Sequence, residues 1–240
     1  MDPLTISAAS GLRSRMETID MLANNLSNST TAGFKLDREF YGVFSGEEQG
    51  EESVMPVIER PWTDFSQGLL QPTGNPLHAA LSGKGFFGVN GPSGPLYTRN
   101  GAFSLSKDGT LQTGEGYTVR AAGGAAIRAA GTGEIEISRD GTVRESGQTL
   151  GQLEVMDFAD PGKLVKQGGS YFRADGVKGV APAANHEVHQ GKLEASNVSG
   201  AEAAARMVGI MRQFEMLQKA ITMAGEMNRK SVDEIAKVGS

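Results

Sequence analysis

A glycine-rich pattern that could hold a phosphate runs from Gly83 to Gly88 and satisfies the GxGxxG spacing of dinucleotide-binding loops. Such a loop must follow a strand and open a helix, because the helix N-terminus then faces the pyrophosphate. Here Phe86 and the residues after it predict a strand, which ends at the turn residues of 90–92. We therefore do not expect a nucleotide site.

The titratable residues also lack the arrangement of a metal or catalytic site. His186 and His189 lie three residues apart, but the sequence offers only Glu187 nearby as a further ligand. His78 has no evident partner, and the glutamates of residues 47–52 form a charge run typical of solvated loops. No GxSxG or Ser–His–Asp pattern is present, and the chain contains no cysteine. We predict that the protein is not an enzyme and has no catalytic, cofactor-binding or metal-binding residues and no cofactor.

Composition excludes further classes of protein. The chain has 240 residues and a net charge of −5, which argues against a nucleic-acid binder with a basic surface. No apolar run approaches the roughly 20 residues of a membrane span, and the first residues lack the basic segment and apolar core of a cleavable secretory signal. Glycine is frequent, with 33 residues, but it is sparse in residues 1–32 and 201–238. Both ends can therefore be helical, while the middle is rich in turns.

Residues 2–28 predict an amphipathic helix. Asp2 is expected to cap it and Pro3 suits its first position. Poor helix formers end it, and we expect Gly33 to be left-handed so that Phe34 can pack inward. Steps of three and four residues, the spacing of a narrow coiled-coil seam, separate Ala9, Leu12, Met16, Ile19, Ala23 and Leu26.

Residues 201–238 predict a second helix, which would extend roughly 57 Å at 1.5 Å per residue. An amphipathic helix of this length needs a partner surface to cover its apolar side. We expect the two terminal helices to pack on each other and on neighbouring subunits. The seam positions of the second helix, eight of them apolar, are Met207, Ile210, Phe214, Leu217, Ile221, Ala224, Asn228, Ser231, Ile235 and Val238.

Between the helices the sequence predicts short strands. Residues 106–111 (SKDGTL) are nearly repeated as residues 138–143 (SRDGTV), and each Asp-Gly pair is typical of a β-hairpin turn. Residues 54–58 and 134–137 also predict strands. The predicted fold class is α+β, with N- and C-terminal helices forming a coiled-coil-like polymerisation core and with a central mainly-β domain. We expect an N-terminal helix and motif in 1–35, a connecting segment with an acidic loop in 36–75, a mainly-β outer domain in 76–185, and a C-terminal segment and helix in 186–240.

Three tracts, in this order, resemble the signature of the flagellar rod, hook and hook-associated axial proteins. Together they span the chain from end to end. The first tract is ANNLSN at 23–28 with TAGFK at 31–35; the second runs from NPL at 75–77 through GKGFF at 83–87 to YTRNGAF at 97–103; the third is LEASNV at 193–198.

Within this family, residues 212–215 (RQFE) and the short chain look most like the proximal-rod subunit. Residues 200–205 depart from the family pattern because they are richer in alanine, which puts the start of the second helix in doubt. The resemblance implies a structural subunit of the bacterial flagellar basal-body rod, which polymerises through its terminal helices and transmits torque from motor to hook.

The resemblance also implies a location and partners. The protein would lie in the periplasmic rod of the basal body and be exported without a cleavable signal peptide. Its partners would be copies of itself, other rod proteins, hook or distal-rod subunits and the flagellar type III export apparatus, with no nucleic acid and no membrane span.

Subunit contacts are expected at residues of the two seams and of the flanking tracts. These residues are Leu12, Met16, Ile19, Ala23, Asn24, Asn25, Leu26, Asn28, Gly33, Phe34, Ser196, Asn197, Val198, Met207, Ile210, Phe214, Leu217 and Ile221.

Several alternatives stay open at this point. Asn24, Asn25 and Asn28 either hydrogen-bond to neighbouring subunits, or to Ser196 and Asn197, or merely terminate the first helix. The methionines of the second helix provide either an adaptable contact surface or ordinary core filling. An alternative function is a secreted, adhesin-like β-domain binding module that its terminal helices oligomerise. A cell-wall enzyme would require convergent carboxylates, which the sequence does not suggest.

Overall fold

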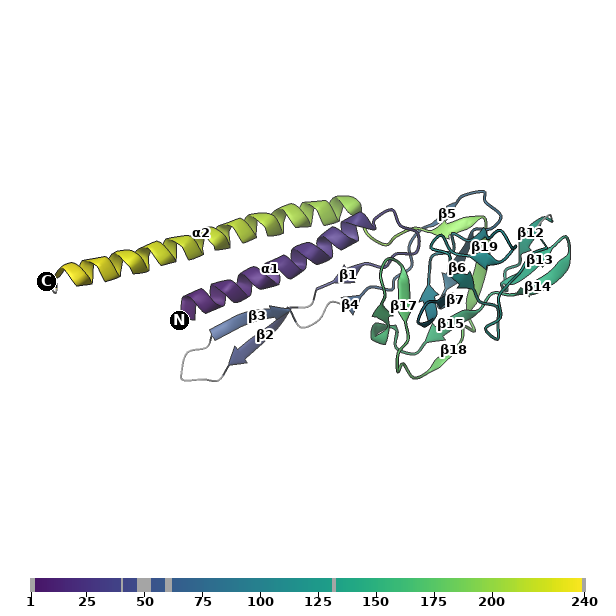
Figure 1. Cartoon of the computed structure of the whole chain (residues 1–240), viewed down its shortest axis with the longest axis horizontal. Helices are drawn as coiled ribbons and strands as arrows, with labels where there is room; N and C mark the ends of the chain where they lie inside the picture. Colours follow the sequence, from purple (N-terminus) through teal and green to yellow (C-terminus); the bar gives the residue numbers. More distant parts are fainter. Residues whose placement is uncertain (1–2, 40, 47–52, 59–61, 131–132, 239–240) are drawn as a thin grey trace. The chain divides into compact units, whose positions relative to one another are not determined.

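The structure is a computed structural model that describes residues 3–39, 41–46, 53–58, 62–130 and 133–238 (Figure 1). The chain divides into two compact units. Unit 1 comprises Met1–Ser27, Asp37–Trp62 and Ser199–Ser240, and unit 2 comprises Asn28–Leu36 and Thr63–Val198. Among the described residues, no helix combines the length and the apolar character needed to cross a membrane.

Unit 1 contains two helices, α1 (Pro3–Ser27) and α2 (Gly200–Val238). Their ends agree with the predicted spans to within one residue, which confirms both helices. Asp2, the predicted cap of α1, lies outside the described residues. Oγ of Ser199 accepts a hydrogen bond from N of Glu202 at 3.4 Å, as in the first half of an S-x-x-E capping box. This cap fixes the start of α2 despite the alanine-rich sequence that follows.

The two helices run antiparallel and pack along one another (Figure 1). Gly11 marks their register, because a Cβ at this position would lie 3.8 Å from Cδ1 of Leu217. Gly11 stands eight residues after the start of α1, whereas Leu217 stands 21 residues before the end of α2. About 13 residues of α2, or ~20 Å of helix, therefore continue past the first residue of α1.

Unit 1 also contains short strands. β2 (Tyr41–Gly46) and β3 (Ser53–Ile58) form an antiparallel pair, which confirms the strand predicted at residues 54–58. β1 (Asp37–Arg38) pairs with β4 (Trp62–Thr63). The predicted acidic loop at residues 47–52 lies outside the described residues.

Unit 2 is mainly β. Nine strands form one antiparallel sheet in the order β16-β17-β8-β7-β11-β10-β9, with β15 joined to both β7 and β18. A second sheet has the order β12-β13-β14, and two further pairs are β19-β6 and β20-β5. The elements are β5 (Leu70–Pro72), β6 (Ala79–Gly83), β7 (Phe86–Gly91), β8 (Gly94–Thr98), β9 (Ser104–Leu105), β10 (Leu111–Gln112), β11 (Thr118–Val119), β12 (Ile135–Ile137), β13 (Thr142–Glu145), β14 (Gln148–Gln152), β15 (Val155–Phe158), η1 (Pro161–Lys163, a 3-10 helix), β16 (Val165–Lys166), β17 (Tyr171–Arg173), β18 (Val180–Pro182), β19 (His186–Gln190) and β20 (Lys192–Glu194).

The two Asp-Gly pairs form turns as predicted. β9 and β10 pair around Gly109, which has φ +76°, and β12 and β13 pair around Gly141, which has φ +85°. Glycine adopts this left-handed conformation without the steric cost that a Cβ adds. The GxGxxG segment runs from the last residue of β6 into β7, so it joins two strands and does not open a helix.

β7 lies at the centre of the core because both of its faces are buried. Phe87 and Val89 point into the larger apolar cluster, where Phe87 contacts Phe103 edge-on with ring centroids 5.2 Å apart. Phe86 points to the opposite face and joins a second cluster around Phe172. Alternate residues of a strand point to opposite faces, so one strand supports both clusters. The chain is thus α+β with a mainly-β central region, as the sequence predicts.

A buried junction of three tracts and a candidate assembly surface

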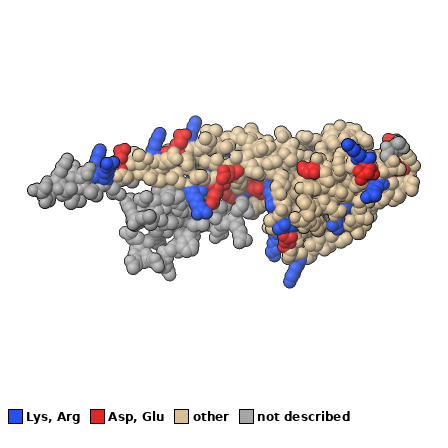
Figure 2. All heavy atoms as spheres, in the orientation of Figure 1, with Lys and Arg blue, Asp and Glu red and all other residues tan. Residues whose placement is uncertain are grey.

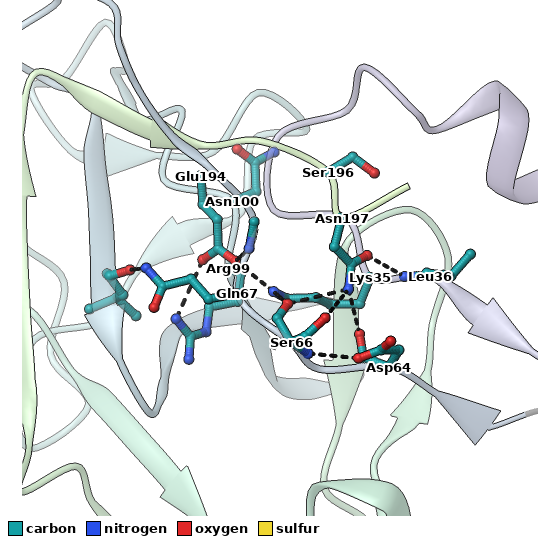
Figure 3. A network of polar contacts seen from close by, with 12 residues as sticks. Lys35, Leu36, Asp64, Ser66, Gln67, Arg99, Asn100, Glu194, Ser196 and Asn197 are labelled. Carbon is teal, nitrogen blue, oxygen red and sulfur yellow. Dashed lines mark hydrogen bonds and ion pairs between the residues drawn. The ribbon is translucent and has the colours of Figure 1, made fainter. Parts of the chain in front are cut away.

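Three charged side chains meet inside unit 2, one from each of the three family-like tracts (Figure 3). Nζ of Lys35 lies 2.5 Å from Oε1 of Glu194, and Nη1 of Arg99 lies 3.4 Å from Oε2 of the same carboxylate. Their side chains are 1% (Lys35), 6% (Arg99) and 0% (Glu194) exposed. Segments far apart in the sequence therefore share one buried ion-pair junction.

Backbone groups satisfy much of the remaining hydrogen-bonding capacity of the junction. Lys35 Nζ donates to O of Ser66 at 2.7 Å, and Arg99 Nη2 donates to O of Gly83 at 2.7 Å. Oε1 of Glu194 also accepts from N of Gly68 at 2.9 Å. Burial lowers the pKa of Lys35 and that of Arg99, while the attraction of Glu194 opposes both shifts.

One carboxylate faces two cations in this junction, so its charge balance depends on Glu194. A buried ion pair contributes little net stability against an apolar replacement, but removal of one partner leaves an uncompensated buried charge. The two ion pairs therefore favour the arrangement in which these three segments meet, because the loss of Glu194 would leave both cations buried without their shared partner.

Asn197 connects the same segments through both ends of its side-chain amide. Its Oδ1 accepts from N of Leu36 at 2.8 Å, and its Nδ2 donates to O of Asp64 at 2.8 Å and to O of Ser66 at 3.2 Å. Ser196 accepts from N of Val198 at 3.2 Å. These residues of the third tract hold unit 2 together by contacts within one chain.

Gly33 is left-handed, with φ +67°, and Phe34 is fully buried, as the sequence predicts. A Cβ on Gly33 would lie 2.2 Å from N of Asn100, so only glycine fits this close approach. Lys166 closes over the segment, because its Nζ lies 4.0 Å from the centroid of the Phe34 ring and donates to O of Lys35 at 2.9 Å.

The residues predicted from the sequence omit Lys35, Arg99 and Glu194. A signal for them exists, since each is the only charged residue in its part of the signature: TAGFK, YTRNGAF and LEASNV. Two cations and one anion in otherwise neutral segments are the pattern of partners that meet in a core.

In unit 1, most of the predicted helix residues are partly buried. The exceptions are Met16, which is 55% exposed, and Asn24, which is also exposed. The side chains of Ala9 and of the α2 seam positions from Ala224 onward lie outside the described part of the chain. The half-buried residues are Leu12, Ile19, Ala23, Leu26, Met207, Ile210, Phe214, Leu217 and Ile221.

The most buried row of α1 is largely polar, and Gly11, which faces Leu217 of α2, lies in line with it. Ser14, Thr18 and Asn25 are buried there with Leu22. Oγ1 of Thr18 donates to Glu39 Oε2 at 2.6 Å. Because α1 packs this row within the chain, Met16 faces outward in the single chain, and its predicted contact with a neighbouring subunit stays a prediction.

Asn25 pairs with the backbone of the same chain. Its Nδ2 donates to O of Asp37 at 2.8 Å, and its Oδ1 accepts from N of Asp37 at 3.0 Å. Asn28 accepts from Oγ1 of Thr31 at 3.1 Å, just after α1 ends. These contacts tie both asparagines to nearby segments of the same chain, and their contacts with neighbouring subunits stay a prediction.

α2 also carries an apolar row away from α1. Met216, Met223 and Met227 are 61%, 63% and 67% exposed, and we call them the outer methionine face. At 100° per residue, the centre of this face lies about 140° round the helix from the seam with α1. The exposed cations Arg212 and Lys219 lie close to it on the helical wheel, and Figure 2 shows Lys and Arg side chains standing along α2.

The outward side of α1 has the opposite charge. Met16, Glu17 and Asp20 are exposed on it, and we call them the acidic α1 face. Arg13 pairs with Glu17 at 3.2 Å across one turn of the helix. Each helix thus has an exposed side with apolar and charged groups, and Asp20 of α1 is opposite in charge to Lys219 of α2.

A hollow in unit 2 has a volume of about 320 Å³, and Glu154 and His186 are among the residues that line it. Glu154 pairs with Arg120, with 2.7 Å between Oε2 and Nε, and Nδ1 of His186 lies 2.8 Å from O of Ala183. These groups are engaged in contacts that stabilise unit 2.

Two family models match the chain. The Flagellar hook protein FlgE/F/G D1 domain matches residues 80–145, and the Flagellar basal body rod FlgEFG protein C-terminal model matches residues 189–234. The first match lies in unit 2 and contains Arg99, whereas the second contains Glu194 and most of α2. The matches therefore include two of the three junction residues and the helix with the outer methionine face.

Curated relatives match over nearly the full chain. The flagellar basal-body rod protein FlgF of Mesorhizobium japonicum is 32% identical over 225 residues, which cover 88% of each chain. FlgG of Borreliella burgdorferi is 31% identical over 250 residues, or 92% of this chain and 94% of the relative. FlgF of Caulobacter vibrioides is 28% identical over 226 residues, or 92% of each chain. These relatives give no support to the adhesin-like alternative, and the chain belongs to the flagellar basal-body rod protein family, as a structural subunit of the rod.

Proposed function

We propose that the protein polymerises through its two terminal helices and transmits torque from the motor to the hook as part of the rod. The observation that carries this proposal is that α2 is apolar on two sides. One side is half-covered by α1, and the outer methionine face is open in the single chain. A helix with two apolar sides needs a second partner, and among the residues that the structure describes, the ~20 Å of α2 beyond α1 has no partner helix.

The second partner is the acidic α1 face of a neighbouring copy. Met16 would contact the outer methionine face, and Asp20 would approach Lys219, so that apolar contact and charge attraction coincide. Methionine suits such a contact because its flexible, polarisable side chain adapts to imperfectly matched surfaces. Contacts at the rim of an interface mainly set register and partner choice, while the buried apolar area supplies the affinity.

This contact joins unlike surfaces, since α2 of one copy meets α1 of the next. Head-to-tail contacts of this kind produce an open helical assembly when the rotation between copies does not close a ring. Many repeated contacts of moderate strength can then resist torque together. The junction residues and Asn25 act indirectly in this proposal, because they fix the segments that follow α1 and precede α2.

The position of the protein in the flagellum follows as part of the same proposal. Its partners would be further copies, other rod proteins and hook or distal-rod subunits, and its place would be the proximal rod in the periplasm. Export through the flagellar type III apparatus would bring it there without a cleavable signal. The curated relatives include both FlgF and FlgG proteins at similar identity, so the proximal position rests on residues 212–215 and on chain length.

Charge reversal at the contact tests the proposal in a strain that lacks the native gene. Asp20→Lys and Lys219→Glu should each reduce swimming and the yield of rods with attached hooks, and the double variant should recover a substantial part of both. Lys107→Glu, an exposed change in unit 2, is the matched control and should leave both unchanged. Equal loss in the single and double variants, with normal protein levels, would contradict the contact between these two faces.

A further inference from the structure

The sulfur atoms of this chain are confined to methionine, because it has ten methionines and no cysteine. The exposed ones in the described structure gather on the two helices, at Met16, Met211 and the outer methionine face. Exposure decides which methionines an oxidant reaches first. Met21, Met156 and Met207 are partly buried and serve as internal references.

We infer that the outer methionine face is an oxidation site that controls assembly, with peroxide as the class of oxidant. This inference rests on the proposed function, because it assumes that Met216, Met223 and Met227 become buried against a neighbouring copy. The oxidised subunit remains folded, since these side chains stand more than half exposed on α2. It loses only the ability to be added to the rod.

The chemical step is a two-electron oxygen transfer. A lone pair of the thioether sulfur attacks one oxygen of hydrogen peroxide, a sulfur–oxygen bond forms and the oxygen–oxygen bond breaks. The leaving hydroxide takes the remaining proton and departs as water, so that methionine is oxidised to the sulfoxide and peroxide is reduced. The sulfoxide is polar, and its burial without a hydrogen-bond partner opposes association.

The position of the sulfur atoms limits this control to subunits that have not yet been assembled. An unassembled subunit presents the outer methionine face to solvent, whereas a subunit within the rod covers it. Peroxide therefore acts on subunits before assembly and spares those already built in. Methionine sulfoxide reductases reverse the change, so an oxidised subunit can be returned to the assembling pool.

The experiment treats full-length protein with hydrogen peroxide before an assembly assay by sedimentation and light scattering. Peptide mass spectrometry should show a gain of about 16 Da first at the outer methionine face and later at Met21 and Met156. The concentration needed for assembly should rise roughly tenfold or more. Treatment with methionine sulfoxide reductases should restore the original value.

A quadruple variant, Met16→Leu, Met216→Leu, Met223→Leu and Met227→Leu, keeps both apolar sides of the contact without sulfur. Its assembly is compared before and after peroxide, so that each protein is its own reference, and the ratio should stay near one. Oxidised wild-type protein that assembles at the original concentration would overturn the inference, as would equal peroxide sensitivity of the quadruple variant. Failure of untreated protein to assemble under any condition would instead contradict the proposed function.

Discussion

Oε1 of Glu194 accepts a hydrogen bond from Nζ of Lys35 at 2.5 Å, although the two residues lie 159 positions apart in the sequence. A second contact joins the same segments, because N of Gly33 donates to O of Glu194 at 2.7 Å. The first and third tracts of the family signature are thus fixed to each other by both backbone and side chain. Arg99 adds the second tract to the same carboxylate.

Neutralising this carboxylate should strongly destabilise unit 2. Glu194→Gln preserves the shape of the side chain but leaves two buried cations without the carboxylate that they share, which we expect to cost about 3–5 kcal/mol in the free energy of unfolding. Urea unfolding followed by the near-UV circular dichroism of tyrosine measures the change. Glu136→Gln, on the exposed side of β12, is the matched control and should stay within about 0.5 kcal/mol of wild type. Similar losses in the two variants would contradict the role given to Glu194.

Alanine at Gly33 should be far less tolerated than alanine at Gly114. The positive φ of Gly33 and the 2.2 Å approach of a Cβ to N of Asn100 together predict a loss of at least about 2 kcal/mol. Gly114 lies in the same unit without a positive φ, and a Cβ there meets nothing within 4 Å. The same urea titration compares the two variants, and comparable stability would show that Gly33 does not require glycine.

Tyr171 should make unit 2 less stable at alkaline pH. Burial and the hydrogen bond that its hydroxyl donates to Glu115 raise the pKa of Tyr171 above the ordinary value of 10. Above pH 10 the unfolded chain loses the phenolic proton while the folded chain retains it, so stability falls as pH rises, by up to about 1.4 kcal/mol per pH unit. Below pH 10 this contribution is fully present.

The difference between wild type and Tyr171→Phe isolates this effect from other alkaline titrations. The variant should show a shallower decline when unfolding is measured between pH 9 and 11.5. Tyr117→Phe, which removes the hydroxyl of the ring stacked edge-on against Tyr171, should retain most of the wild-type slope. Identical slopes in wild type and Tyr171→Phe would rule out the predicted linkage.

Trypsin should cut the dilute monomer first in α2. Arg229 and Lys230 are exposed and lie in the part of α2 that continues past α1, where a single helix without a partner is only marginally stable. Lys35 and Arg99 are tryptic sites held in the junction, so cleavage there should appear much later. Mass spectrometry of the fragments over time checks the order, and early cleavage after Lys35 or Arg99 would contradict it.

Local features of the fold could be predicted because their causes are local. Pro3 and the sparse glycine content of the ends define the helices, and the Asp-Gly pairs at 108–109 and 140–141 define two turns. The left-handed Gly33 and the inward Phe34 also follow from residue type and position. In each case the physical reason lies within a few residues of the feature.

Long-range pairing was beyond the reach of the sequence patterns. Glu194 gives no local sign of whether it meets Lys35, Arg99 or solvent, because its partners come from other parts of the chain. Thr18 and Asn25 lie on a buried side of α1 that apolar spacing cannot reveal, since polar groups there are satisfied by Glu39 and Asp37. Which faces of the helices meet another copy stays a prediction.

Cysteine cross-linking between separate copies tests that prediction most directly, since the natural chain has no cysteine. One protein carries Asp20→Cys and the other Lys219→Cys, and they are mixed under assembly conditions with a mild oxidant. We predict a disulfide-linked heterodimer in the mixture and little dimer from either protein alone, with no product when Lys107→Cys replaces Lys219→Cys. An assembled mixture without the heterodimer, or with equal yields from all pairs, would contradict the head-to-tail contact between α1 and α2.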